Sequence, residues 1–320
     1  MKRSTKIWLI TAACLVLLGV ILFIGVIATL NWDFLKLSTI KYKTNTHEIT
    51  EPFDHLSLTT DTADIVFALA EDGKCSVICR EEETAKHAVT VENGTLIIKI
   101  DRQKSWYENI GISFDSPTIT LYLPKTEYDA LSITERTGRI VIPNRFSFED
   151  VDISLSTGDV GFCASAAQSV KVKASTGNIR VENVSVGALD LSVTTGKVTA
   201  SGVTCRGDIT VGISTGKATL SNISCKNVLS TGRTGNITLN HVIAAEKISV
   251  ERSTGEVKFS GCDAAELSVK TTTGNVSGSL LTDKVFLTDT DTGSVEVPKT
   301  AVGGKCEIKT RTGDIKMEIK

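Results

Sequence analysis

Residues 151–200 read VDISLSTGDVGFCASAAQSVKVKASTGNIRVENVSVGALDLSVTTGKVTA, and this stretch decides the fold. It contains three copies of one unit, in which apolar and polar residues alternate up to a Thr-Gly pair and alternate again after it. In the third copy Leu189, Leu191 and Val193 precede the pair, and Val198 follows it. Alternation with a period of two is typical of β-strands that bury one face. Each unit therefore predicts two short strands joined at a tight corner.

The Thr-Gly pair recurs at ten regularly spaced positions, and the glycines of these ten pairs are spaced by 20, 19, 19, 20, 19, 20, 19, 19 and 20 residues. A strict period near 20 indicates one supersecondary unit per repeat, stacked so that each unit covers the apolar side of the next. Glycine suits such a corner because it adopts φ above zero without steric cost. The ten repeat corners are Gly138, Gly158, Gly177, Gly196, Gly216, Gly235, Gly255, Gly274, Gly293 and Gly313.

These observations predict an all-β protein, a β-solenoid of about ten rungs of 19–20 residues. With strands ~4.8 Å apart, the rod would be roughly 45 Å long. The period alone leaves open whether the cross-section has two sheets or three faces. The residue after each glycine varies irregularly in charge. This excludes a calcium-binding β-roll, which needs aspartate at the same corner in successive turns.

An apolar segment precedes the repeats. Ile7–Leu30 carries no charge and follows Lys2, Arg3 and Lys6. As a helix it would span about 36 Å, enough for a ~30 Å hydrocarbon core. The basic residues before it predict a cytoplasmic N-terminus and a body outside the membrane. A cleaved signal peptide, or a lipoprotein modified at Cys14, would also place the body outside, but the apolar run is longer than either usually has. We expect a single-pass signal anchor in the plasma membrane.

The sequence thus predicts five segments: a cytoplasmic tail (1–6), the transmembrane signal anchor (7–30), a polar juxtamembrane stalk (31–50), an irregular β region (51–130) and the Thr-Gly repeat solenoid (131–320). Within the irregular region, Thr62-Ala63-Asp64 looks like a degenerate corner with Ala63 in place of glycine. Strands are expected there at His55–Thr60, Ile65–Leu69, Cys75–Cys79, Thr95–Ile100 and Thr118–Leu123.

Two places outside the regular repeats are candidates for contact with partners. Arg102–Asp115, which contains Trp106 and Tyr107, either caps the first rung or forms a recognition loop, since function concentrates on loops held by rigid scaffolds. At the other end, Asp314–Lys320 is predicted to be a final strand with no cap after it. Its charges discourage stacking into fibrils. Its inner side still needs cover, so another chain could dock at this uncapped C-terminal rung.

The cysteines and histidines give no sign of a catalytic or metal centre. Cys205 and Cys225 each lie nine residues after a corner glycine in adjacent rungs, so stacking could bring them within disulfide range. There is no Cys-x-x-Cys pair, and the four histidines are dispersed without a ligand partner at metal spacing. We expect no catalytic residue, no bound metal and no cofactor. A net charge of −2 gives no reason to expect nucleic acid.

The units at 156–160, 175–179 and 194–198, Ser-Thr-Gly-Asp-Val, Ser-Thr-Gly-Asn-Ile and Thr-Thr-Gly-Lys-Val, resemble the bacterial putative-adhesin family of β-strand-repeat proteins. That family is a domain of unknown function related to toast-rack-like domains. The resemblance covers about residues 50–320. It implies a bacterial source, a solenoid fold and placement at the surface or envelope, and it brings no catalytic residues. It also implies an association with envelope-stress systems.

The resulting hypothesis is a membrane-anchored, extracytoplasmic β-solenoid that acts as a non-catalytic binding or adhesion scaffold for a protein, a glycan or an envelope polymer. The alternative is a cell-envelope stress accessory that works through a membrane partner and uses the anchor in its mechanism. A polysaccharide-cutting enzyme is disfavoured because outward charges such as Asp152, Lys171 and Glu251 are scattered in sign. A purely mechanical spacer is the remaining interpretation.

Overall fold

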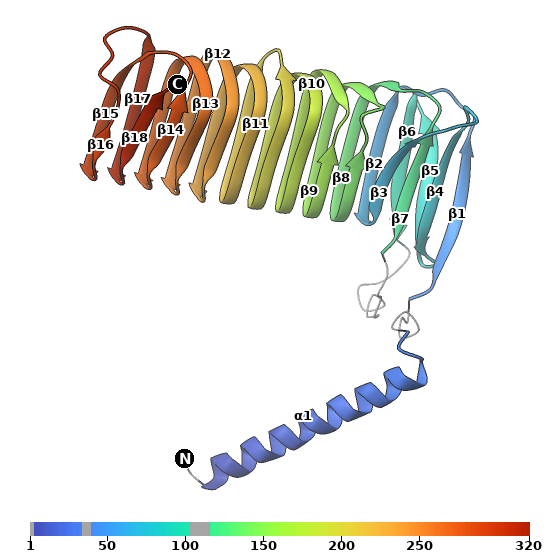
Figure 1. Ribbon diagram of the computed structural model, residues 1–320. Helices are drawn as coiled ribbons and strands as arrows, with labels where there is room; N and C mark the ends of the chain where they lie inside the picture. The colour runs from blue at the N-terminus through green and yellow to red at the C-terminus, as the bar shows by residue number, and fades with distance from the viewer. Residues whose placement is uncertain (1–2, 34–39, 103–115) are drawn as a thin grey trace.

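The computed structural model describes residues 3–33, 40–102 and 116–320, and in these residues one helix precedes eighteen strands of a single sheet (Figure 1). The helix α1 runs over Arg3–Thr29 and carries no charge after Lys6. It is long and apolar enough to cross a membrane, and a signal sequence near the N-terminus would have the same properties. The chain therefore begins with an apolar helix that is either an anchor or a signal sequence.

The strands fall into two groups along the chain. The first group contains β1 (Tyr42–Ile49), β2 (His55–Thr62), β3 (Asp64–Leu69), β4 (Cys75–Glu82), β5 (Ala85–Glu92), β6 (Thr95–Arg102) and β7 (Thr118–Leu123). The second group contains β8 (Glu127–Ile142), β9 (Ser147–Phe162), β10 (Ser165–Cys205), β11 (Asp208–Thr234), β12 (Ile237–Thr254), β13 (Val257–Thr273), β14 (Val276–Leu280), β15 (Lys284–Thr292), β16 (Val295–Glu296), β17 (Gly304–Thr312) and β18 (Ile315–Ile319).

The second group forms the predicted β-solenoid, with parallel pairing at a spacing of about 20 residues. The corner glycines line up along one edge, as in the pairing of Gly196 with Gly216. A Cβ on Gly196 would lie 1.8 Å from the carbonyl oxygen of Gly177, and the φ angle of Gly196 is 150°. The Gly235 amide donates a 2.8 Å hydrogen bond to the carbonyl of Thr254 in the next turn. Only glycine permits turns to approach this closely at the corner.

Each turn contains three runs of inward-facing apolar side chains. In one turn these runs are Leu189, Leu191 and Val193, then Val198 and Ala200, then Val203 and Cys205, all of them buried. The first two runs meet at the Thr-Gly corner. The second and third meet at a residue in the left-handed region, six positions after the corner glycine. That second corner holds residue types that tolerate this conformation, namely Asn183, Gly202, Asn222, His241 and Gly261.

The polar residue that follows a corner glycine bonds to the neighbouring turn. The amide of Asn178 donates to Oδ1 of Asp159 at 2.9 Å, and the amide of Glu256 donates to Oδ1 of Asn236 at 2.9 Å. Short Asp and Asn side chains thus accept a hydrogen bond from an amide at the corner of the next turn. These hydrogen bonds explain the recurrence of Asp and Asn at this edge without any bound cation.

The N-terminal end of the coil is closed by antiparallel strands. β2 and β3 form a turn whose corner is Ala63, and the Ala63 amide donates to the carbonyl of Thr137 at 3.1 Å. β6 and β7 stack in parallel on this turn, β5 and β4 then pair with them in antiparallel fashion, and β1 pairs with β4. The polar segment 31–50 was expected to be a stalk, but it contains β1, and β5 was also not predicted. β1 carries polar residues such as Asn45 toward its partner, so apolar alternation is missing there. In β5 only Val89 and Val91 continue the alternation, because the buried His87 takes the inward position before them.

The C-terminal end corrects the prediction of an uncapped final rung at Asp314–Lys320. β17 and β18 pair with β13 and β14 on one side and with β15 and β16 on the other. The last repeat in the sequence therefore lies inside the stack, and β15–β16 form the outermost turn (Figure 1). Thr288 of β15 stands at the position where β17 has Ile308. A polar residue at this inward position suits the outermost turn, because the outer side of that turn meets water.

Candidate functional site

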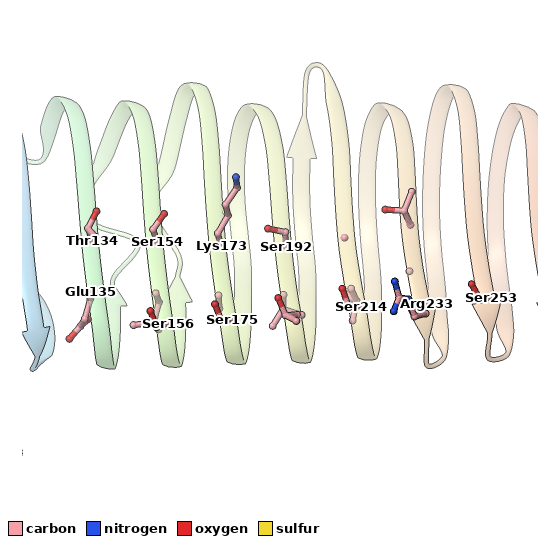
Figure 2. A pocket seen from close by; sticks show the side chains of 18 residues that line it. Thr134, Glu135, Ser154, Ser156, Lys173, Ser175, Ser192, Ser214, Arg233 and Ser253 are labelled. Carbon is pink, nitrogen blue, oxygen red and sulfur yellow. The ribbon is translucent and has the colours of Figure 1, made fainter.

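Two rows of small polar side chains run along the outer face of the strands that lead into the Thr-Gly corners (Figure 2). They occupy the positions four and two residues before each corner glycine, which point outward because strands alternate their side chains. A groove of about 710 Å³ lies along them. The upper row in Figure 2 includes Thr134, Ser154, Lys173 and Ser192, and the lower row includes Ser156, Ser175, Ser214, Arg233 and Ser253.

The groove exists because its lining residues are small. Serine, threonine and glycine leave the backbone between the two rows uncovered, and residues at this intermediate position, such as Val193, also line the groove. The lining extends from the turn of Gly138 to the turn of Gly255, seven turns in all. At a strand spacing of ~4.8 Å this corresponds to roughly 29 Å. The groove is thus a long, shallow strip with hydroxyl groups at regular intervals.

The charges in the groove come from three residues. Lys173 and Arg233 are exposed, whereas Glu135 at one end is buried. The Ala63 amide donates to Oε1 of Glu135 at 3.1 Å, while Oε2 has no hydrogen-bond partner among the described residues. Burial raises the pKa of the Glu135 carboxyl from 4.5 to about 8, the Ala63 amide opposes that rise, and Asp64 adds to it. A neutral Glu135 leaves the groove with a net positive charge.

Glu135 makes folding stability depend on pH. The unfolded chain releases this proton near pH 4.5 and the folded chain near pH 8, so the free energy of unfolding falls as pH rises between these values. Glu135→Gln keeps an acceptor for the Ala63 amide and removes this pH dependence. We expect its free energy of unfolding near pH 8 to exceed that of the wild type by on the order of 1–2 kcal/mol, and near pH 5 to be similar. Urea unfolding at the two pH values measures this, and equal differences at both would contradict it.

A second polar cluster is buried at the N-terminal end of the coil. Oγ1 of Thr60 lies 2.9 Å from Nε2 of His87, and Nδ1 of His87 lies 2.7 Å from Oε2 of Glu81. Nδ2 of Asn45 donates to the other oxygen of Glu81 at 2.6 Å. The Cys79 sulfur, the Glu81 carboxylate and the His87 ring all offer ligand atoms within 4.8 Å of one another. The expectation that no histidine has a ligand partner is therefore wrong, because antiparallel pairing joins residues that sequence spacing does not.

The order hydroxyl, imidazole, carboxylate is that of a nucleophile, its base and an orienting acid. However, Thr60, His87 and Glu81 are only 6%, 4% and 1% exposed, so no substrate reaches the hydroxyl in this conformation. Burial, together with the Glu81 charge, raises the pKa of the Cys79 thiol to about 12. The cluster can hold a proton or a metal ion, but it cannot act on an external substrate as it stands.

The structure places the other predicted residues as follows. The ten glycines occupy the corners described above. Cys205 and Cys225 are both free and buried, and the pairing of Thr204 with Ser224 brings them to neighbouring positions, so a disulfide between them stays a prediction. Trp106 and Tyr107 lie outside the described residues. Sequence reasoning missed the groove, although its signal was present as serine or threonine at two fixed distances before the glycine.

Comparisons with known proteins give the following matches. Residues 53–212 and 203–320 match the protein family described as Toastrack DUF4097. No curated protein matches the chain. Among solved structures, a putative adhesin from Bacteroides fragilis is 16% identical, with a TM-score of 0.42 over 87% of this chain and 97% of that one. A putative lipid binding protein from Parabacteroides distasonis is 16% identical, with a TM-score of 0.46 over 84% and 97% of the two chains.

Proposed function

This chain belongs to the Toastrack DUF4097 family, and we propose that its solenoid is a non-catalytic scaffold that binds a linear glycan of the cell envelope or cell surface along the groove. The observation that carries the proposal is the pair of hydroxyl rows on either side of uncovered backbone over seven turns. Serine and threonine hydroxyls both donate and accept hydrogen bonds, which suits a ligand that is itself covered in hydroxyls. A periodic scaffold also matches a periodic polymer.

The charges of the groove favour a glycan that carries acidic groups. Lys173 and Arg233 are exposed lining residues, and the one acidic lining residue, Glu135, is buried with a raised pKa. Lys173 and Arg233 lie three turns apart, which corresponds to roughly 14 Å. Two cations at this separation support binding of a chain with spaced carboxylates or phosphates, since each contributes a charge-assisted hydrogen bond.

The placement of the protein is part of this proposal. Helix α1 would serve as a signal anchor in the plasma membrane, with residues 1–6 in the cytoplasm and residues 31–320 outside. Its uncharged length and the basic residues before it support this orientation. An anchored solenoid outside the membrane would meet envelope glycans directly, which a cytoplasmic protein would not.

A glycan array tests the proposal with the detergent-solubilised full-length chain. We expect retention on acidic linear glycans, and we expect Ser192→Trp to weaken that retention at least tenfold because the indole fills the middle of the groove. Ser201→Trp is the matched control. Ser201 is equally half-buried and lies in the same strand β10, but after the corner and away from the groove. It should bind as the wild type does.

Two results would contradict the proposal. One is a lack of retention on every glycan by a chain whose circular dichroism spectrum shows folded β-structure. The other is an equal loss of binding in Ser192→Trp and Ser201→Trp, which would mean that the ligand does not lie in the groove.

A further inference from the structure

The buried cluster at the N-terminal end has the donor atoms of a zinc site. Cys79 supplies a sulfur, His87 a ring nitrogen and Glu81 a carboxylate oxygen, all within 4.8 Å of one another. Zn²⁺ accepts a thiolate, an imidazole and a carboxylate as ligands, with bonds of about 2.0–2.3 Å. In tetrahedral geometry the nitrogen and oxygen would stand about 3.3 Å apart. The present separation of 2.7 Å between Nδ1 and Oε2 is shorter than this by about half an ångström, so these two side chains must move apart to admit the ion.

The charges of the cluster also favour a divalent cation. A thiolate, a carboxylate and a neutral imidazole together carry two negative charges, so bound Zn²⁺ leaves the buried site neutral. In the structure Nδ1 of His87 and Oε2 of Glu81 face each other at 2.7 Å inside the protein, where polar groups need a partner. A metal ion would take the place between these two atoms, and binding of the Cys79 sulfur as thiolate would release its proton to solvent.

The surrounding residues orient the three donors. Nδ2 of Asn45 donates a hydrogen bond to Oε1 of Glu81. The backbone amide of His87 donates to Oε2 of Glu81, the oxygen that faces the His87 ring, at 2.6 Å. Thr60 lies against Nε2 of His87 and can accept its proton, which leaves the lone pair of Nδ1 directed at the cluster. Such hydrogen bonds from outer residues usually fix the tautomer and ring orientation of a metal-bound histidine.

The position of the cluster gives a metal ion a structural role. Cys79 and Glu81 come from β4 and His87 comes from β5, and these two strands pair with each other only at Glu82 and Ala85. Beyond that pair, β4 pairs with β7 and β5 pairs with β6. In the sequence β6 precedes the segment 103–115 and β7 follows it, and that segment contains no Thr-Gly pair. We propose that Cys79, Glu81 and His87 bind one Zn²⁺ ion, which ties the two antiparallel strands of the N-terminal cap to each other.

Cobalt titration tests this proposal directly. The full-length chain in detergent, reduced and stripped of metal with a chelator, is titrated with Co²⁺ while the thiolate-to-cobalt absorption in the near ultraviolet is recorded. We expect one equivalent to bind with this absorption, and Zn²⁺ to displace it. Cys79→Ser should abolish the absorption, and His87→Gln should weaken cobalt binding at least tenfold. Cys75→Ser is the matched control, because Cys75 is a buried cysteine of the same strand that does not belong to the cluster.

The thermal unfolding midpoint gives a second readout. Zn²⁺ should raise it in the wild type and in Cys75→Ser but not in Cys79→Ser. The proposal is overturned if the folded wild-type chain takes up neither Co²⁺ nor Zn²⁺, or if Cys79→Ser keeps the same absorption. It is also overturned if Cys75→Ser loses the absorption, since the thiolate would then lie elsewhere. In those cases the cluster is a hydrogen-bonded network alone.

Discussion

Gly196→Ala is expected to destabilise the solenoid strongly, as the same change at the other corner glycines should. The added Cβ would lie 1.8 Å from the oxygen and 2.8 Å from the carbon of the Gly177 carbonyl, both of which are backbone atoms. In addition, the φ angle of 150° is one that alanine rarely adopts. Steric overlap and backbone strain together should lower the free energy of unfolding by roughly 3 kcal/mol or more. Urea unfolding followed by circular dichroism measures the loss.

Gly212→Ala provides the control for this experiment. Gly212 lies in the next turn, its φ angle is outside the left-handed region, and the nearest atom to an added Cβ is the Cβ of Ser192 at 3.6 Å. We expect a change within about 0.5 kcal/mol. If Gly196→Ala were tolerated equally well, the corner would not require glycine, and the observed spacing between turns would be incorrect.

Ile308→Ala is expected to cost about 2–4 kcal/mol, because it removes a fully buried side chain from an interior turn. This residue belongs to the last repeat in the sequence, where simple stacking would predict a half-open end and a small loss. In the structure β17 has neighbours on both sides, so the cavity cannot be filled by solvent or by relaxation of a free edge. Thermal or urea unfolding of the full-length chain gives the value.

Thr288→Ala, at the paired position in the outermost turn, is the matched comparison. Its side chain is half-buried and the turn has a partner on one side only, so we expect a loss below about 1 kcal/mol. Should Thr288→Ala prove as costly as Ile308→Ala, or costlier, β15 rather than β17 would be the interior strand.

Much of the architecture was predictable because it repeats. The period of the Thr-Gly pair and the alternation around it are enough to predict the solenoid, its corner edge and the degenerate corner at Ala63. The second corner was equally accessible in principle. Residues of types that tolerate a left-handed conformation, such as Asn183, Gly202 and His241, recur six positions after the glycine. It was missed because the residue type varies while the backbone requirement stays constant.

The features that the sequence did not predict depend on single contacts between distant segments. Arg252 falls at an inward position, and the structure accommodates it because Ser230 and Gly232 of the preceding turn are small and leave room for the guanidinium. Nζ of Lys284 is likewise buried, 2.7 Å from Oδ1 of Asp263. Neither contact leaves a periodic signal. The same holds for the cluster at Cys79, in which Glu81 and His87 stand at inward positions of β4 and β5 that apolar residues would otherwise occupy.

The position of β17–β18 within the stack has a consequence for biosynthesis. A nascent chain can add turns one by one as they leave the ribosome, up to β14. Residues 284–296 then emerge before β17 and β18, the strands on which they will rest. Closure of this end of the stack therefore waits until residues 304–319 have been made. A polypeptide that stops before β17 would leave the apolar side of β13 without its partner, and exposed apolar surface of this kind is recognised by chaperones and prone to aggregate.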